Sequence, residues 1–320
     1  MNKKQKEVQQ LFLDQEKEVL KKLEANYEDA LSEINSKIEL LVSRQDADMQ
    51  HVIYQVEYQK ALKSQVSAIL EQLHNNEFET VSEYLAASYE DGFIGSVFDM
   101  HGQNVPLMMP INQEELVTAV QLDSKISEGL YTRLGEDVNL LKKRITAQVS
   151  RGIATGAGWK QVAQQLANQT RVGYNRAIRI ARTEGHRIQN TAIMNAAEDA
   201  KERGADLVKQ WDATLDGKTR ESHVAVDGEI RELNEKFSNG LDYPGDPAGG
   251  AAEVVNCRCV MLQRARWAVG GSFTKFNNFT KQLETFEIPE AYDEFKKGFF
   301  SDENKKYMNY VQQMEEKYGT

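Results

Sequence analysis

One histidine and two cysteines in the last third of the chain have the residue types of a metal-binding site. His223 lies on a predicted short helix, and Cys257 and Cys259 stand one residue apart near a predicted strand. Imidazole and thiolate are ligands that zinc prefers. The three side chains therefore predict a structural zinc site, with Asp216, Asp227 or water as the fourth ligand. A bound ion would hold together a small unit that contains a long loop.

The same residue types leave other interpretations open. A cysteine beside a histidine can act as a nucleophile, and Arg258 could lower the pKa of a neighbouring thiol. A metal with an open coordination position would instead serve a hydrolase or nuclease that uses His223, Cys257 and Cys259. Cysteines on a strand can also simply face a core. Two cysteines are too few for a secreted disulfide framework and poorly placed to bridge each other, so we expect thiols or thiolate ligands.

The elements expected to position these residues form a small mixed α/β unit over residues 205–265. Rough alternation of apolar and polar residues, ended by turn signals, predicts short strands, and Asp216 is expected to cap the helix. The predicted elements are a strand at 206–214, a helix at 218–226, a strand at 228–232 and a strand at 257–262. The long loop before the last strand is of a kind that is usually functional or pinned.

The chain before this unit is predicted to be mostly helical. No glycine precedes Gly92 and no proline precedes Pro106. Apolar residues recur every three or four positions between Leu20 and Leu41, which indicates a helix packed on another helix. A second such run follows a polar interval, so residues 1–90 form either a helical hairpin or one bent helix. We interpret them as a structural arm rather than a docking interface.

Three further segments complete the predicted organisation. Glycines and prolines at 91–112 indicate a loop or hinge. Residues 113–204 form a helical basic region of several short helices, and the amphipathic, aromatic residues at 266–320 form a helical tail. The predicted fold class is α+β, mostly helical, with a long N-terminal helical arm and a small mixed α/β unit toward the C-terminus.

Composition restricts the class of protein. The 320 residues include 39 Lys and Arg against 49 Asp and Glu, a formal net charge of −10, so the whole chain does not resemble a basic nucleic-acid binder. No run approaches the roughly 18 apolar residues of a membrane span. The charged N-terminus lacks the apolar stretch of a secretory signal. We expect a protein made in the cytoplasm without a membrane span.

One segment departs from this acidic balance. Residues 141–190 contain ten basic residues and one acid, a formal charge of +9, which leaves −19 for the other 270 residues. Such asymmetry favours a polyanionic partner, either double-stranded DNA or an acidic protein surface, unless the basic residues pair with the chain's own acids. At helical pitch, Arg176, Arg179 and Arg187 share one side of a helix. The candidate contact residues are Lys142, Lys143, Arg144, Arg171, Arg176, Arg179 and Arg187.

Several motifs together resemble the phage minor head, or head morphogenesis, proteins called MuF-like. The resemblance covers about residues 141–262 and depends on both the order and the spacing of the motifs. In chain order, the matching residues are Ala181-Arg182-Thr183-Glu184, Asn190, Asn195, the run from Lys209 to Arg220, His223, Asp227-Gly228, Asp246-Pro247 and Asn256-Cys257-Arg258-Cys259.

The resemblance implies a structural minor capsid protein of a tailed phage or prophage, located in the virion inside the capsid or at the portal vertex. The implied partners are the portal protein, other capsid proteins and packaged DNA, and the implied roles are head assembly and DNA delivery. It implies no catalytic residues, and the 58 residues after Leu262 are fewer than an added enzymatic domain needs. We therefore expect the other motif residues to have a structural, scaffold role: Arg182, Glu184, Trp211, Asp216, Arg220, Asp227 and Asn256.

Overall fold

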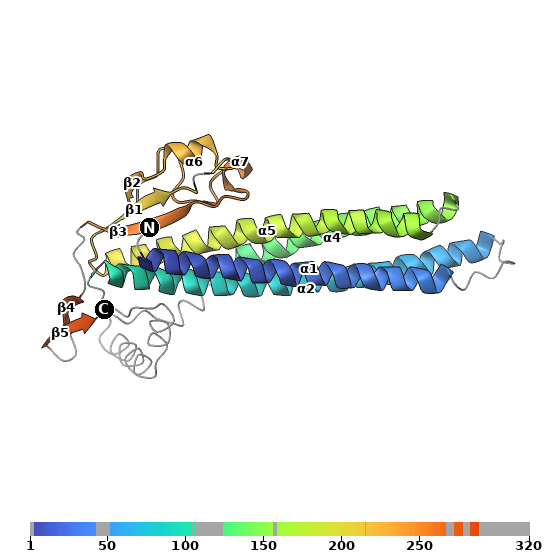
Figure 1. Cartoon of the computed structure of the whole chain (residues 1–320), viewed down its shortest axis with the longest axis horizontal. Coiled ribbons are helices and arrows are strands. Elements are labelled where there is room, and N and C mark those ends of the chain that lie inside the picture. The colour runs from blue at the N-terminus through green and yellow to red at the C-terminus, as the bar shows by residue number, and fades with distance from the viewer. Residues whose placement is uncertain are drawn as a thin grey trace. The chain divides into compact units, whose positions relative to one another are not determined.

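The computed structural model describes residues 3–42, 52–103, 105, 124–155, 159–214, 216–266, 272–277 and 282–287. Within them the chain is mostly helical, and a small three-stranded antiparallel sheet follows the long helices (Figure 1). The predicted α+β class, with a helical N-terminal part and a small unit of strands and short helices, is confirmed. No helix among these residues is both long enough and apolar enough to cross a bilayer.

Long helices come first in the chain, and strands with short helices follow. The long helices are α1 (Lys3–Val42), α2 (Val52–Gly102), α4 (Ser124–Thr155) and α5 (Trp159–Glu202). The later elements are β1 (Leu207–Asp212), α6 (Glu221–Ala225), β2 (Ile230–Glu232), α7 (Ala251–Val254), β3 (Val260–Ala265), β4 (Ser272–Asn277) and β5 (Gln282–Glu287).

The chain divides into two compact units, neither of which is continuous in sequence. The first, here called the sheet unit, comprises Met1–Gln15, Leu85–Leu122 and Thr183–Thr320. The second, the helical unit, comprises Glu16–Tyr84 and Asp123–Arg182. Helices α1, α2 and α5 contribute segments to both units, so three of the unit boundaries fall inside helices, whereas α4 lies wholly in the helical unit.

The helical unit is built around one apolar core that draws on all four long helices. Ile34 from α1, Leu70 from α2, Ile145 from α4 and Leu166 from α5 are each at most 1% exposed. Each helix has apolar residues at intervals of three and four, which places them on one face. Burial of these faces against one another is the main force that holds such a bundle together.

Contacts between α1 and α2 decide between the two predicted arrangements of the N-terminal part. Within the helical unit, the Asn26 amide donates to Thr80 Oγ1 at 3.2 Å, and Lys22 pairs with Glu83 at 3.9 Å. Partners later in α1 thus lie earlier in α2, so the two helices are antiparallel. The hairpin is correct and the single bent helix is wrong; residues 43–51 lie outside the described residues.

The predicted loop at 91–112 is wrong for residues 91–102, which continue α2 as helix. Gly92 and Gly95 allow close helix contacts there instead of ending the helix. A Cβ on Gly92 would lie 3.0 Å from Ala192 Cβ of α5, and one on Gly95 would lie 2.6 Å from Val8 Cγ1 of α1. Tertiary packing therefore explains glycines that sequence reasoning takes as breakers.

The predicted series of short helices at 113–204 is also wrong over its described part, which forms the two long helices α4 and α5. Gly173 lies inside α5, where a Cβ would meet Tyr27 Cε1 at 3.0 Å and Leu141 Cδ2 at 3.1 Å. Its role is again a close approach between helices. Residues 113–123 and 156–158 lie outside the described residues.

The predicted helical tail is wrong where the structure describes it. Residues 272–277 and 282–287 form β4 and β5, an antiparallel pair in which Ser272 lies opposite Glu287 and Asn277 opposite Gln282 (Figure 1). Strand pairing depends on a second segment, which the periodicity of one segment does not reveal. The remainder of the predicted tail, residues 288–320, lies outside the described residues.

The three-stranded sheet has the order β2-β1-β3, with both pairs antiparallel. Its predicted strands are present, but β3 begins at Val260, so Cys257 and Cys259 precede the strand. Asn190 of α5 fastens β3 in place: its Oδ1 accepts from the Met261 backbone N–H at 2.7 Å, and its side chain is fully buried. The segment that carries the cysteines is thereby fixed relative to α5.

Candidate metal centre

The sheet unit brings His223, Cys257 and Cys259 together at one buried point. His223 Nδ1 lies 3.6 Å from Cys257 Sγ and 3.4 Å from Cys259 Sγ, and the three potential ligand atoms all lie within 4.8 Å of one another. The side chains are 1%, 4% and 2% exposed. Both cysteines are free thiols. The structure therefore brings together the three side chains that the sequence suggests as metal ligands.

Apolar packing holds these side chains in position. His223 lies on the short helix α6, and its ring meets the ring of Trp211 of β1 edge-on at 5.1 Å. Trp211 also packs edge-on against Phe237 at 5.2 Å, and both aromatic residues belong to the buried cluster that includes the cysteines. Trp211 is fully buried, so its expected scaffold role agrees with its position.

The second nitrogen of the histidine ring faces a carboxylate. His223 Nε2 lies 2.9 Å from Glu253 Oε2, and Ser222 Oγ donates to the same oxygen at 2.8 Å. Glu253 sits on the short helix α7, thirty residues after His223. Sequence reasoning did not find Glu253, because no spacing rule joins a residue on α6 to one on α7. Only the search for a carboxylate partner of the histidine would have suggested it.

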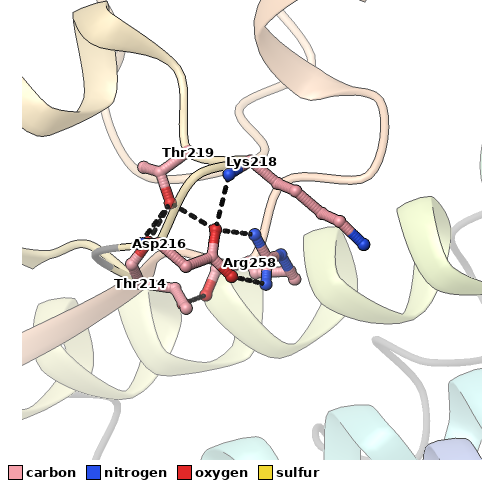
Figure 2. Close-up of polar contacts among 5 residues, drawn as sticks. All are labelled: Thr214, Asp216, Lys218, Thr219 and Arg258. Atoms are coloured by element: carbon pink, nitrogen blue, oxygen red, sulfur yellow. Dashed lines mark hydrogen bonds and ion pairs between the residues drawn. The ribbon is translucent and has the colours of Figure 1, made fainter.

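Arg258, between the two cysteines, is locked to the turn that contains Asp216 (Figure 2). Its guanidinium donates to both Asp216 carboxylate oxygens, at 2.6 and 2.7 Å. Thr214 Oγ1 donates to the Arg258 carbonyl at 2.9 Å. The Asp216 carboxylate also accepts from the Lys218 backbone N–H at 2.9 Å and from the Thr219 hydroxyl. The Cys-Arg-Cys segment is thus tied to the end of β1.

These contacts correct two predictions about Asp216. It does not cap the helix, because α6 begins at Glu221 with Arg220 as its N-cap residue and without a side-chain cap. Its carboxylate is committed to Arg258, which holds the pKa of Asp216 well below its usual range. Among the described residues, neither Asp216 nor Asp227 joins the three-residue ligand cluster.

The remaining motif residues in this unit support the backbone around the site. The Arg220 guanidinium donates to the Val255 carbonyl at 2.5 Å. Asp227 accepts from the Ala213 backbone N–H at 2.8 Å. Asn256, which has a positive φ of 54°, donates its backbone N–H to Thr183 Oγ1 at 3.1 Å.

The two thiols share their protons unequally. The hydrogen bond from Cys257, aided by the His223 ring, holds the pKa of Cys259 below its usual range, at about 5. The hydrogen bond to Cys259 and burial raise the pKa of Cys257. A lowered thiol pKa favours the thiolate form, which is the form that binds metals.

Residues 143–262 match the family described as Phage Mu protein F like protein. This stretch contains the whole metal-ligand cluster, the Asp216–Arg258 pair and most of the basic segment. Over this stretch, the resemblance to the MuF-like phage minor head proteins is confirmed.

Two relatives extend the similarity beyond the MuF-like region. The chain is 26% identical over 252 residues to "Minor head protein GP7" of Bacillus phage SPP1, an alignment that covers 76% of this chain and 80% of the relative. It is 29% identical over 305 residues to "NAD(+)--arginine ADP-ribosyltransferase EFV" of Enterococcus faecalis (strain ATCC 700802 / V583). That alignment covers 92% of this chain but only 60% of the relative. No solved structure matches the chain significantly.

Part of the basic segment of the MuF-like region pairs with the chain's own acids. Arg176 contacts Asp137 at 2.8 Å in the helical unit, and Arg187 contacts Glu184 at 2.9 Å in the sheet unit. Arg176 and Arg187 therefore do not form the shared cationic face predicted from helical pitch. Arg182, expected to be scaffold, pairs with an acid of α1, at 2.8 Å.

Other basic candidates of the MuF-like region remain at the surface of the helical unit. Lys143, Arg171 and Arg179 are exposed, and Lys142 and Arg144 are half-buried. Among the described residues, these five make no ion pair. They are the part of the predicted contact surface that can still meet a polyanion.

Proposed function

We propose that this chain is a structural minor head protein that associates with the portal and contacts packaged DNA during head assembly and genome delivery. The match of residues 143–262 to the MuF-like family supports the structural role, as does the long alignment with the minor head protein of phage SPP1. A location inside the capsid or at the portal vertex belongs to the same proposal.

The observation that carries the DNA contact is the set of basic residues on α4 and α5 that make no ion pair with the described residues. These helices are antiparallel, because Arg176 pairs with Asp137 and a Cβ on Gly173 would meet Leu141. The same register brings Arg171 level with the lysines at 142 and 143. Clustered cations on adjacent helices can neutralise neighbouring phosphates and release their counterions.

A DNA-binding titration against salt concentration tests this contact. We expect the affinity of the full chain for double-stranded DNA to fall steeply with salt, and Lys143→Glu with Arg171→Glu to reduce the slope by about two. Lys63→Glu, at an exposed position of α2 outside the basic segment, is the matched control and should bind like the wild type. A flat salt response of the wild-type protein would refute the DNA contact.

Prohead assembly tests the portal association separately. Proheads assembled with portal protein should incorporate the chain, and proheads assembled without it should not. Normal incorporation into portal-free proheads would contradict the association, whatever the DNA titration shows.

We propose further that the chain acts without catalytic turnover. The deep burial of His223, Cys257 and Cys259 favours a closed structural site over an open hydrolase or nuclease site that must admit water and substrate. One relative is named an arginine ADP-ribosyltransferase, but this chain aligns with only 60% of its length. Incubation with labelled NAD⁺ and arginine-containing proteins, and with DNA, should yield neither labelled protein nor cleaved DNA; either product would refute this proposal.

A further inference from the structure

We propose that Cys257 Sγ, Cys259 Sγ and His223 Nδ1 bind a structural zinc ion in the sheet unit. The family match and the relatives assign no metal to these residues. The inference does not depend on contact with the portal or with DNA.

The spacing of the three atoms fits tetrahedral zinc. Zinc binds sulfur at about 2.3 Å and nitrogen at about 2.0–2.1 Å, so a tetrahedral angle places the two ligand atoms about 3.6 Å apart. The observed distances from His223 Nδ1 are 3.6 Å to Cys257 Sγ and 3.4 Å to Cys259 Sγ. An ion could therefore enter without rearrangement of the backbone.

The orientation of the histidine ring favours a cation over a simple hydrogen bond. A neutral ring that carries its proton on Nε2, the nitrogen 2.9 Å from the Glu253 carboxylate, leaves Nδ1 unprotonated. Nδ1 then presents a lone pair to both sulfurs. A nitrogen lone pair and two sulfurs that converge on one buried point form a donor set that suits zinc. The alternative without metal is a hydrogen-bonded group of the two cysteines and the imidazole.

Glu253 has the position of an outer residue that orients a metal ligand. Histidines that bind metals usually donate their other ring N–H to a carboxylate or carbonyl, which fixes the ring and makes it a stronger ligand. Ser222 Oγ in turn donates to Glu253 at 2.8 Å. Glu253 is thus a positioning residue, which would not touch the ion itself.

The ion would join parts of the unit that are distant in sequence. Cys257 follows His223 by 34 residues, and most of the intervening chain is turns and loop. The local apolar cluster is small; its members besides the cysteines are Trp211, Val226, Phe237 and Leu241, with Ala213 packed against it. A metal ion bound across a long loop stabilises the folded state, because its ligands move apart and release the ion when the chain unfolds.

The ligands that the cluster supplies are two sulfurs and one nitrogen. The cluster supplies three protein ligands from the described residues, and zinc in proteins is usually four-coordinate. X-ray absorption of the zinc-loaded protein should therefore show two sulfur neighbours together with two lighter atoms.

The decisive experiment uses the full chain expressed with zinc in the medium. Elemental analysis should find one zinc per chain, and a chelator should lower the temperature of an unfolding transition that added zinc restores. After replacement by cobalt, thiolate-to-metal charge-transfer bands should appear, and Cys257→Ser or Cys259→Ser should abolish them. His74→Gln, a buried histidine of the helical unit, is the matched control and should keep both zinc and spectrum.

Glu253→Gln tests the geometry in a variant that keeps all three ligands. Its zinc affinity should fall 10- to 100-fold, and an unchanged affinity would refute the positioning role. Wild-type protein with far less than one zinc per chain, and with no thermal shift on zinc addition, would overturn the site and favour the hydrogen-bonded group without metal. Equal zinc content in the cysteine variants would likewise overturn it, by placing the ion elsewhere.

Discussion

Glu77 on α2 should make the stability of the helical unit depend on pH. Its side chain is 1% exposed in the bundle interior. Burial, together with the negative charge of Asp137, raises the pKa of Glu77 from 4.5 to about 8, although the neighbouring Tyr27 hydroxyl acts in the opposite direction. Asp137 is itself paired with Arg176. The folded chain thus holds a proton that the unfolded chain releases near its ordinary pKa.

The size and sign of the effect follow from proton linkage. Between pH 4.5 and 8 the folded state binds more protons than the unfolded state, so the free energy of unfolding falls as the pH rises. Each pKa unit corresponds to about 1.4 kcal/mol, so the full window corresponds to about 5 kcal/mol. From pH 6 to pH 8, above the isoelectric point, the wild type should lose about 2 kcal/mol of unfolding free energy through this group.

Glu77→Gln removes the titration while it keeps the shape of the side chain. Denaturant unfolding followed by helical circular dichroism, at pH 6 to 9, should show a weaker pH dependence in the variant and a clear gain in stability above pH 8. Glu79→Gln, at an exposed position of the same helix, is the control and should follow the wild type. Parallel pH profiles of the wild type and Glu77→Gln would refute the reasoning.

Three other substitutions test packing and polar contacts. Gly173→Val places a side chain against Tyr27 Cε1 at 3.0 Å and should cost about 1–3 kcal/mol in denaturant unfolding; stability equal to the wild type would contradict the close helix contact. Asn190→Ala leaves the buried Met261 N–H without its acceptor and should lower the free energy of unfolding by about 1–3 kcal/mol. A loss below about 0.5 kcal/mol would argue that this hydrogen bond does not hold β3 in place. Arg258→Ala frees the Cys-Arg-Cys segment, so the thiols should react faster with an alkylating reagent, whereas an unchanged rate would show that the pair does not restrain them.

In the helical unit, hydrophobic periodicity alone predicts the helices but not their lengths. Apolar residues at intervals of three and four predict the helices, since a helix with one apolar face must bury it. Gly92, Gly95 and Gly173 were misleading for helix length, because glycine both breaks helices and permits close helix contacts. Only the neighbouring helix distinguishes the two uses.

The basic segment shows the same limit for charge. The count of ten basic residues against one acid is a property of the sequence. Whether a given arginine forms an ion pair depends on acids far away in the chain. Arg176 pairs with Asp137 and Arg182 pairs with Glu16. Arg171 has no ion pair among the described residues. Pairing of this kind is decided by how the helices lie against one another.

The candidate metal centre also could be predicted from the sequence only in part. The types of His223, Cys257 and Cys259 suggested a shared site from the sequence, because few residue types provide imidazole and thiolate ligands. The sequence did not reveal Glu253 as the partner of His223, nor that Asp216 binds Arg258 rather than capping a helix. Ligand chemistry belongs to individual residues, whereas distance and orientation arise only when separate segments fold together. The sequence therefore determined which groups are available, and the tertiary structure decided which of them meet.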